Sequence, residues 1–236
     1  LHHLIPMLRQ ADEQELLRAR FVLVPMANPF GMANFVQRRH LGRSDLATGV
    51  NYNRQWPDLF AMIRSALAGR LNDDEAFNVT LIRRAVAQWI DAQQPRSAAE
   101  QLRLFLLREA HDAAFVLDLH CDTEGLPYIY TSPELMPELQ DLADWMGAAA
   151  VLTAADSGGA SFDEVLPLLY RKIAQTNPGK PVPLATASAT LEYRGLADVD
   201  DQYAEQDAVR LFGFLAGRGL VAADPGPRPV PQAITA

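Results

Sequence analysis

The sequence predicts an α/β protein, a three-layer α/β/α sandwich with a mostly parallel, mixed sheet. Short apolar stretches of strand length alternate along the chain with longer stretches whose apolar residues recur at helical spacing. This alternation is typical of sheets whose strands are joined by helices. Hydrophobic residues make up 49% of the 236 residues, which is enough for a sizeable core.

The first half of the chain is expected to be mainly helical. Polar residues and glycines over 38–56 predict a long loop, and long loops in compact domains are often functional. Ser97 and Glu100 form a capping box that starts one helix, and Asn72 or Asp73 can cap the helix before it. The predicted elements are a helix over 2–18, a strand over 21–25, a turn over 28–31, and helices over 57–70, 73–93 and 97–111.

Strands and helices alternate in the second half. An apolar run from Ala113 to Leu117 predicts a strand that ends at His120. Gly158 and Gly159 are expected to open a mobile loop before a helix. The predicted elements are strands over 113–120, 127–131, 149–152 and 182–193, and helices over 132–146, 162–174 and 202–217.

Composition and charge exclude several classes of partner. The formal net charge of −8 predicts no nucleic-acid footprint. We find no signal peptide and no apolar run of about 18 residues, so we expect no membrane segment. The only cysteine, Cys121, cannot form an internal disulfide and is expected to be buried. We therefore expect a cytoplasmic protein that binds a small molecule, and a homo-oligomer is compatible with this sequence.

The two ends of the sequence predict a chain cut from a longer one. Residue 1 is Leu, and the apolar spacing from Leu1 to Leu8 is that of the inside of a helix. The sequence closes on a proline-rich stretch with the composition of a linker. We expect a core over 1–222 and a linker over 223–236.

Asp118 and His120 come at the end of a buried apolar run. Residues two apart on a strand point to the same side, so these two side chains would emerge together at the strand's carboxyl end. Open α/β sheets bind their ligands at that edge. Neutral imidazole is a common metal ligand, and a nearby carboxylate can fix its tautomer. The alternative is a histidine that only hydrogen-bonds a neighbour.

The loop over 42–54 is dense in hydrogen-bond donors. Arg43, Asn53 and Arg54 could converge on an anion, since arginine offers a planar fork to a carboxylate. By composition alone a solvated loop with surface arginines is the favoured alternative.

Glu192 ends an apolar stretch just before the turn residue Gly195. A carboxylate there can act as a general base if it reaches a bound water. The commoner alternative for a lone glutamate is a surface side chain paired with a neighbour, here Arg194.

Five short motifs, in their order along the chain, resemble the succinylglutamate desuccinylase/aspartoacylase family of the zinc carboxypeptidase-like clan. The order makes the resemblance specific although each motif is short, and it covers about residues 1–222. The motifs are Asn28-Pro29 with Gly31, Gly42-Arg43, Asn53-Arg54 before Trp56-Pro57, Asp118-Leu119-His120, and Leu191-Glu192-Tyr193-Arg194-Gly195.

The resemblance implies a zinc carboxypeptidase-like fold that binds one Zn²⁺ per subunit and hydrolyses an amide bond. It also implies a role for each candidate residue. His120 would be the third zinc ligand, and Asp118 would contact His120 and not the zinc. Glu192 would be the general base, and Arg43 would contact the oxyanion. Asn53 and Arg54 would contact the substrate carboxylate.

One departure from the family pattern matters for activity. The family's first two zinc ligands lie in a motif that this sequence lacks, so we expect the remaining ligands upstream of Leu1. If these residues were the whole molecule, we would expect an inactive protein, because catalytic zinc takes three protein ligands. The first hypothesis is a zinc-dependent deacylase acting on a small N-acyl amino acid. The alternatives are a metallocarboxypeptidase that trims peptides and a catalytically inactive carboxylate-binding relative.

Overall fold

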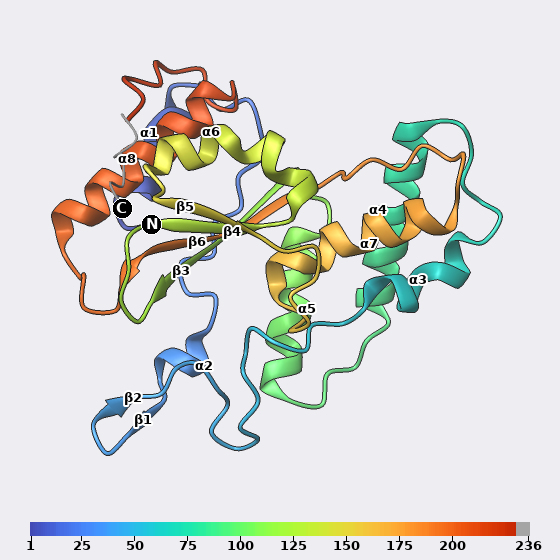
Figure 1. Ribbon diagram of the computed structural model, residues 1–236, viewed down its shortest axis with the longest axis horizontal. Coiled ribbons are helices and arrows are strands. Elements are labelled where there is room, and N and C mark those ends of the chain that lie inside the picture. Colours follow the sequence, from blue (N-terminus) through green and yellow to red (C-terminus); the bar gives the residue numbers. More distant parts are fainter. Residues whose placement is uncertain (230–236) are drawn as a thin grey trace. The chain divides into compact units, whose positions relative to one another are not determined.

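The computed structural model describes residues 1–229 and confirms the predicted α/β fold class (Figure 1). Its central, mostly parallel sheet has four strands in the order β3-β6-β4-β5, and β4 and β5 pair in parallel. The strands are β3 (Phe115–Asp122), β4 (Tyr128–Thr131), β5 (Ala150–Thr153) and β6 (Ala187–Gly195).

The chain divides into two compact units, and the division passes through β3 and β6. The first unit contains Leu1–Pro25, Leu119–Thr153 and the chain from Thr190 onward. The second unit contains Met26–Asp118 and Ala154–Ala189.

Helices cover the strands of the first unit. They are α1 (Leu4–Glu13), the 3₁₀ turn η1 (Pro133–Leu135), α6 (Met136–Met146) and α8 (Asp201–Gly217). Helix α6 packs against β4, β5 and α8, and α8 also packs against α1. Gly213 lets α8 approach α6 closely, because a Cβ there would lie 2.4 Å from the Trp145 ring. The buried side chains of Leu142 and Phe214 form part of the resulting core.

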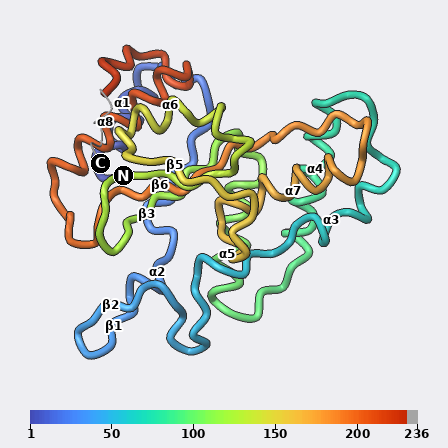
Figure 2. Tube along the Cα trace, in the orientation of Figure 1, coloured from blue at the N-terminus to red at the C-terminus, as the bar shows by residue number. Residues whose placement is uncertain are grey.

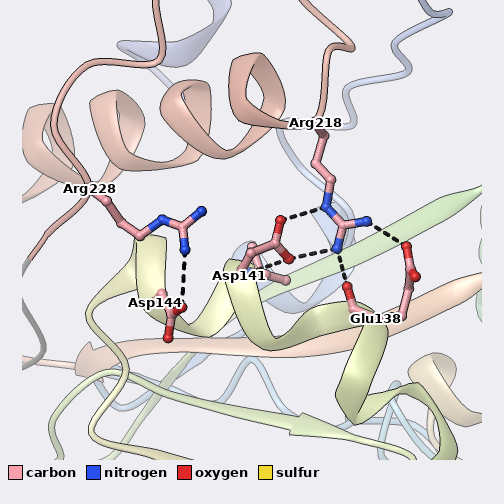
Figure 3. A network of polar contacts seen from close by, with 6 residues as sticks. Glu138, Asp141, Asp144, Arg218 and Arg228 are labelled. Carbon is pink, nitrogen blue, oxygen red and sulfur yellow. Dashed lines mark hydrogen bonds and ion pairs between the residues drawn. The ribbon is translucent and has the colours of Figure 1, made fainter.

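An arginine fastens the end of α8 to α6. The Arg218 guanidinium donates to both carboxylate oxygens of Asp141, at 2.5 and 2.6 Å, and to the carboxylate of Glu138 at 2.5 Å (Figure 3). Arg228 donates to Asp144 on the same helix at 3.4 Å. These bonds hold the chain after α8 against α6.

The second unit is mainly helical. Its elements are α2 (Pro29–Met32), β1 (Phe35–Val36), β2 (Arg39–His40), α3 (Leu59–Leu67), α4 (Glu75–Asp91), α5 (Ala98–Ala110) and α7 (Phe162–Thr176). Helix α3 packs against α4 and α7, and α4 packs against α5. These helices share one apolar cluster, in which Ile63, Ile82, Leu107 and Ile173 are fully buried. Figure 2 follows the irregular chain that leads from the β1–β2 hairpin to α3.

Most predicted elements are present, but several local expectations were wrong. The helix predicted over 2–18 covers only Leu4–Glu13, and the strand predicted to end at His120 continues to Asp122. Residues 21–25 form no strand, and Val22 is 45% exposed, because a short apolar run does not by itself specify a buried strand. The predicted loop over 38–56 begins inside the β1–β2 hairpin. Asp74, rather than Asn72 or Asp73, caps α4 by accepting from the Phe77 amide. Cys121 is exposed.

The Ser97 half of the capping box at α5 is confirmed, since the Ser97 hydroxyl oxygen accepts from the Glu100 amide at 3.1 Å. The Glu100 carboxylate accepts from the amide of Arg96, the residue before the cap, and not from that of Ser97. Within residues 1–229, no helix has the length and apolar character needed to cross a membrane. The predicted linker is without helix or strand over 223–229, and its remainder, 230–236, lies outside the described residues.

Candidate functional site

Neighbouring strands bring His120 and Glu192 together in the first unit. Strands β3 and β6 are hydrogen-bonded neighbours, and His120 Nδ1 lies 3.9 Å from Glu192 Oε1. The Glu192 side chain is 12% exposed and the His120 side chain 31% exposed. A buried carboxylate beside a partly exposed imidazole can accept a proton at a position that a small ligand can reach.

Glu192 is not the surface residue of the alternative interpretation. It lies on the buried strand β6, between Leu191 and Tyr193. Arg194 instead directs its guanidinium to Asp207 of α8, with bonds of 2.6 and 2.9 Å. The hydrogen bonds to the Asp207 carboxylate raise the pKa of Arg194 above its ordinary value. Arg194 therefore fixes α8 to the end of β6.

A tyrosine–aspartate pair lies close to this site and was missed from the sequence. The Tyr128 hydroxyl donates to Asp122 Oδ2 at 2.7 Å. Burial raises the pKa of Tyr128, and the hydrogen bond to Asp122 and the charge of Glu192 raise it further. Tyr128 is therefore a neutral donor. Asp122 follows His120 by two residues on β3, and this spacing could have identified it.

Asn53 anchors a second group of residues, in the second unit. Its side-chain oxygen accepts from the Phe162 amide at 2.9 Å and from the Trp56 indole at 3.0 Å. The Trp56 and Phe162 rings also pack together, with centroids 4.6 Å apart. The Asn53 oxygen thus caps the start of α7, and its amide nitrogen is the part of the side chain that can donate to an anion.

Arg54 lies at the end of the 42–54 loop, and its side chain packs against the loop that precedes α7. A Cβ added to Gly159 would lie 2.8 Å from Arg54 Nε and 2.9 Å from its Cδ. One guanidinium nitrogen donates to the Asn53 carbonyl at 2.7 Å. Two backbone bonds, from Gln55 to Gly159 and from Trp56 to Ala160, join the segments. The remaining N–H groups of such a guanidinium suit a carboxylate.

Arg43 lies at the base of a turn and is exposed. Its carbonyl accepts from the Tyr52 amide at 3.1 Å, and Ser44 pairs with Asn51 in an isolated antiparallel bridge. The Asn28 side chain donates to the Gly42 carbonyl at 3.2 Å. These bonds organise the 42–54 loop, while the Arg43 side chain has the exposure of a surface arginine.

Two buried carboxylates start α7, and the sequence reasoning missed them as well. Asp163 and Glu164 are both buried. Burial raises the pKa of Asp163, a hydrogen bond from Ser161 opposes this, and the charges of Glu164 and Asp118 add to the rise. Asp118 therefore interacts electrostatically with Asp163. Their position in the first turn of a predicted helix, where carboxylates are favoured, could have identified them from the sequence.

The described residues do not complete a zinc site. A catalytic zinc takes three protein ligands. Within residues 1–229, no group of three His, Cys, Asp or Glu side chains is placed to hold a metal ion. His120 and Glu192 alone do not meet this requirement.

Comparisons with known proteins support the resemblance seen in the motifs. No family model and no curated protein match the chain. A solved structure of a succinylglutamate desuccinylase/aspartoacylase family protein from Shewanella amazonensis SB2B is similar over 97% of this chain, with 25% identity and a TM-score of 0.78. Another, from Shewanella frigidimarina NCIMB 400, is similar over 87%, with 24% identity and a TM-score of 0.75.

The chain spans 63% and 56% of the lengths of these two proteins. Its structural neighbours are thus succinylglutamate desuccinylase/aspartoacylase family proteins, and the resemblance predicted from five sequence motifs is confirmed by the fold.

Proposed function

We propose that this chain forms the core of a zinc-dependent hydrolase that cleaves the amide bond of a small N-acyl amino acid or a related amide with a carboxylate. The observation that carries the proposal is the approach of His120 Nδ1 to the buried Glu192 carboxylate at 3.9 Å. The fold shared with desuccinylase/aspartoacylase family proteins supports a deacylase-type reaction.

Glu192 is the proposed general base. Its carboxylate takes a proton from the attacking water and passes it to the leaving amine, a role for which a partly desolvated carboxylate beside an open face is suited. We propose that His120 supplies one of three protein ligands of one zinc ion per subunit, with Asp118 behind it. The other ligands would come from outside the described residues.

Asn53, Arg54 and Arg43 are the proposed contacts to the substrate. The Arg54 guanidinium and the Asn53 amide nitrogen would hold the substrate carboxylate, which fixes the amide that reacts. Arg43 would stabilise the oxyanion that forms at the carbonyl. The chemistry of this set favours a small anionic substrate. A cytoplasmic location, which we also propose, agrees with a chain that has a single cysteine.

The test is hydrolysis by the natural protein, assayed on N-acyl amino acids, on the matching carboxamides and on longer peptides. We expect turnover of the N-acyl amino acids and much weaker turnover of the carboxamides. Preferential trimming of peptides would instead support a metallocarboxypeptidase. Binding of the carboxylate without turnover or zinc would support an inactive relative.

Metal analysis tests the His120 assignment separately. The His120→Ala variant should fail to retain zinc at one ion per subunit. A variant that still holds one tightly bound zinc would remove His120 from the ligand set, while a matched His111→Ala variant should leave the zinc content unchanged.

A further inference from the structure

The loop over residues 157–159 is fixed by a carboxylate of the neighbouring helix. Glu164, in the first turn of α7, accepts from the Ser157 amide at 2.8 Å and from the Ser157 hydroxyl at 3.1 Å. Glu164 is buried, so both bonds are shielded from water. Hydrogen bonds to a charged group contribute more than neutral ones, especially where water is excluded. The loop that the sequence predicted to be mobile is therefore tied at its start.

This loop also contacts the side chain of Arg54. Gly159 has no side chain, and the Arg54 side chain passes where a Cβ would stand, within 2.8 Å of its Nε and 2.9 Å of its Cδ. Backbone bonds from Gln55 and Trp56 to the same loop keep the two segments in register. The position of the guanidinium therefore depends on where the loop lies.

We propose that the 157–159 loop positions the Arg54 guanidinium. In this proposal Glu164 is the positioning residue that fixes the loop, and Gly159 leaves room for the Arg54 side chain. The inference rests on the proposed function, in which Arg54 binds the substrate carboxylate. It adds two residues that touch no substrate and yet set the preference of the protein for a carboxylate over its amide.

The experiment measures binding of N-acetylalanine and of its carboxamide to the full chain by calorimetry. Glu164→Ala should weaken binding of the carboxylate about 10-fold, on the order of one lost charge-assisted contact, and leave the carboxamide unchanged. Glu164→Gln should restore part of the affinity, because its amide oxygen still accepts from Ser157. Gly159→Ala should have an effect similar to that of Glu164→Ala, since the new Cβ displaces Arg54.

Two controls separate positioning from general damage. Ser161→Ala removes a neighbouring hydroxyl–carboxylate bond, of 2.7 Å to Asp163, and leaves both bonds of Glu164 in place. It should leave the preference for the carboxylate unchanged. In an Arg54→Ala background, Glu164→Ala should cause no further loss. An equal loss for both probes, or a full loss that persists without Arg54, would overturn the inference.

Amide hydrogen exchange distinguishes this inference from the proposed function. Exchange at Ser157 should speed up in Glu164→Ala but not in Arg54→Ala. Unchanged exchange at Ser157 would overturn the role of Glu164 and leave the role of Arg54 standing. A wild-type protein that shows no preference for the carboxylate would overturn the role of Arg54, and this inference with it.

Discussion

The two compact units hold their candidate residues by different means. In the first unit, His120 and Glu192 lie on neighbouring strands, so the regular geometry of the sheet brings them within 3.9 Å. In the second unit, Asn53 and Arg54 lie on irregular chain, and individual side-chain bonds hold them to the loop before α7. The placement of the first group therefore depends mainly on strand pairing, whereas that of the second depends on particular side-chain hydrogen bonds.

The largest effect should come from Glu192, the proposed general base in the first unit. Glu192→Gln keeps the shape of the side chain and removes its basicity, so we expect a loss of roughly 10²–10⁴-fold in kcat. Zinc content should stay the same. Turnover and metal content of the natural protein are the measurements. Near-normal turnover in this variant would exclude Glu192 as the base.

A smaller effect is expected from Arg54, the proposed contact to the substrate carboxylate in the second unit. Arg54→Ala should lower kcat/KM for an N-acyl amino acid by roughly 10- to 150-fold, which corresponds to about 1.5–3 kcal/mol for a charge-assisted hydrogen bond. The matching amide should be affected far less. Arg54→Lys should rescue only partly, because lysine keeps the charge but lacks the planar fork. If acid and amide fall equally, Arg54 supports the loop instead of binding the substrate.

The stability of the first unit should also depend on a single side chain, that of Arg218. Arg218 makes bonds to Glu138 and Asp141 that join the end of α8 to α6 (Figure 3). Arg218→Ala should lower the free energy of unfolding by about 1–2 kcal/mol, more than an ordinary surface pair, because the contact with Asp141 is bidentate. Urea unfolding measures this. Arg9→Ala, at an exposed position on α1, is the control and should change the free energy little.

The smallest effect concerns Asp163 and should depend on pH. Its pKa is raised in the folded protein, mainly by burial, so the folded state holds the proton more tightly than the unfolded chain. The contribution of Asp163 to the free energy of unfolding is therefore largest below the ordinary Asp pKa of about 3.9 and is lost as pH rises through the raised value. The Asp163→Asn substitution should remove this pH-dependent loss. The variant should therefore become more stable relative to the wild-type protein as pH rises. Unfolding at several pH values tests it, and a constant difference would contradict the shift.

Local pattern was enough to predict most of the helices and strands. The strand ending near His120, the Ser97 cap of α5, and the strand that carries Glu192 all follow from short-range spacing of apolar and polar residues. The strand expected at 21–25 does not form. A short apolar run is compatible with several environments, and tertiary packing decides which of them it occupies.

The sequence by itself determined the α/β class, the presence of most helices and strands and the residue types available for chemistry, because these depend on neighbours within a few positions. Only the tertiary structure decided that Glu192 is buried beside His120, that the Asn53 oxygen caps α7, and that the Arg54 side chain packs against Gly159. Each of these contacts joins residues far apart along the chain. Their formation depends on how whole elements pack, which no local spacing encodes.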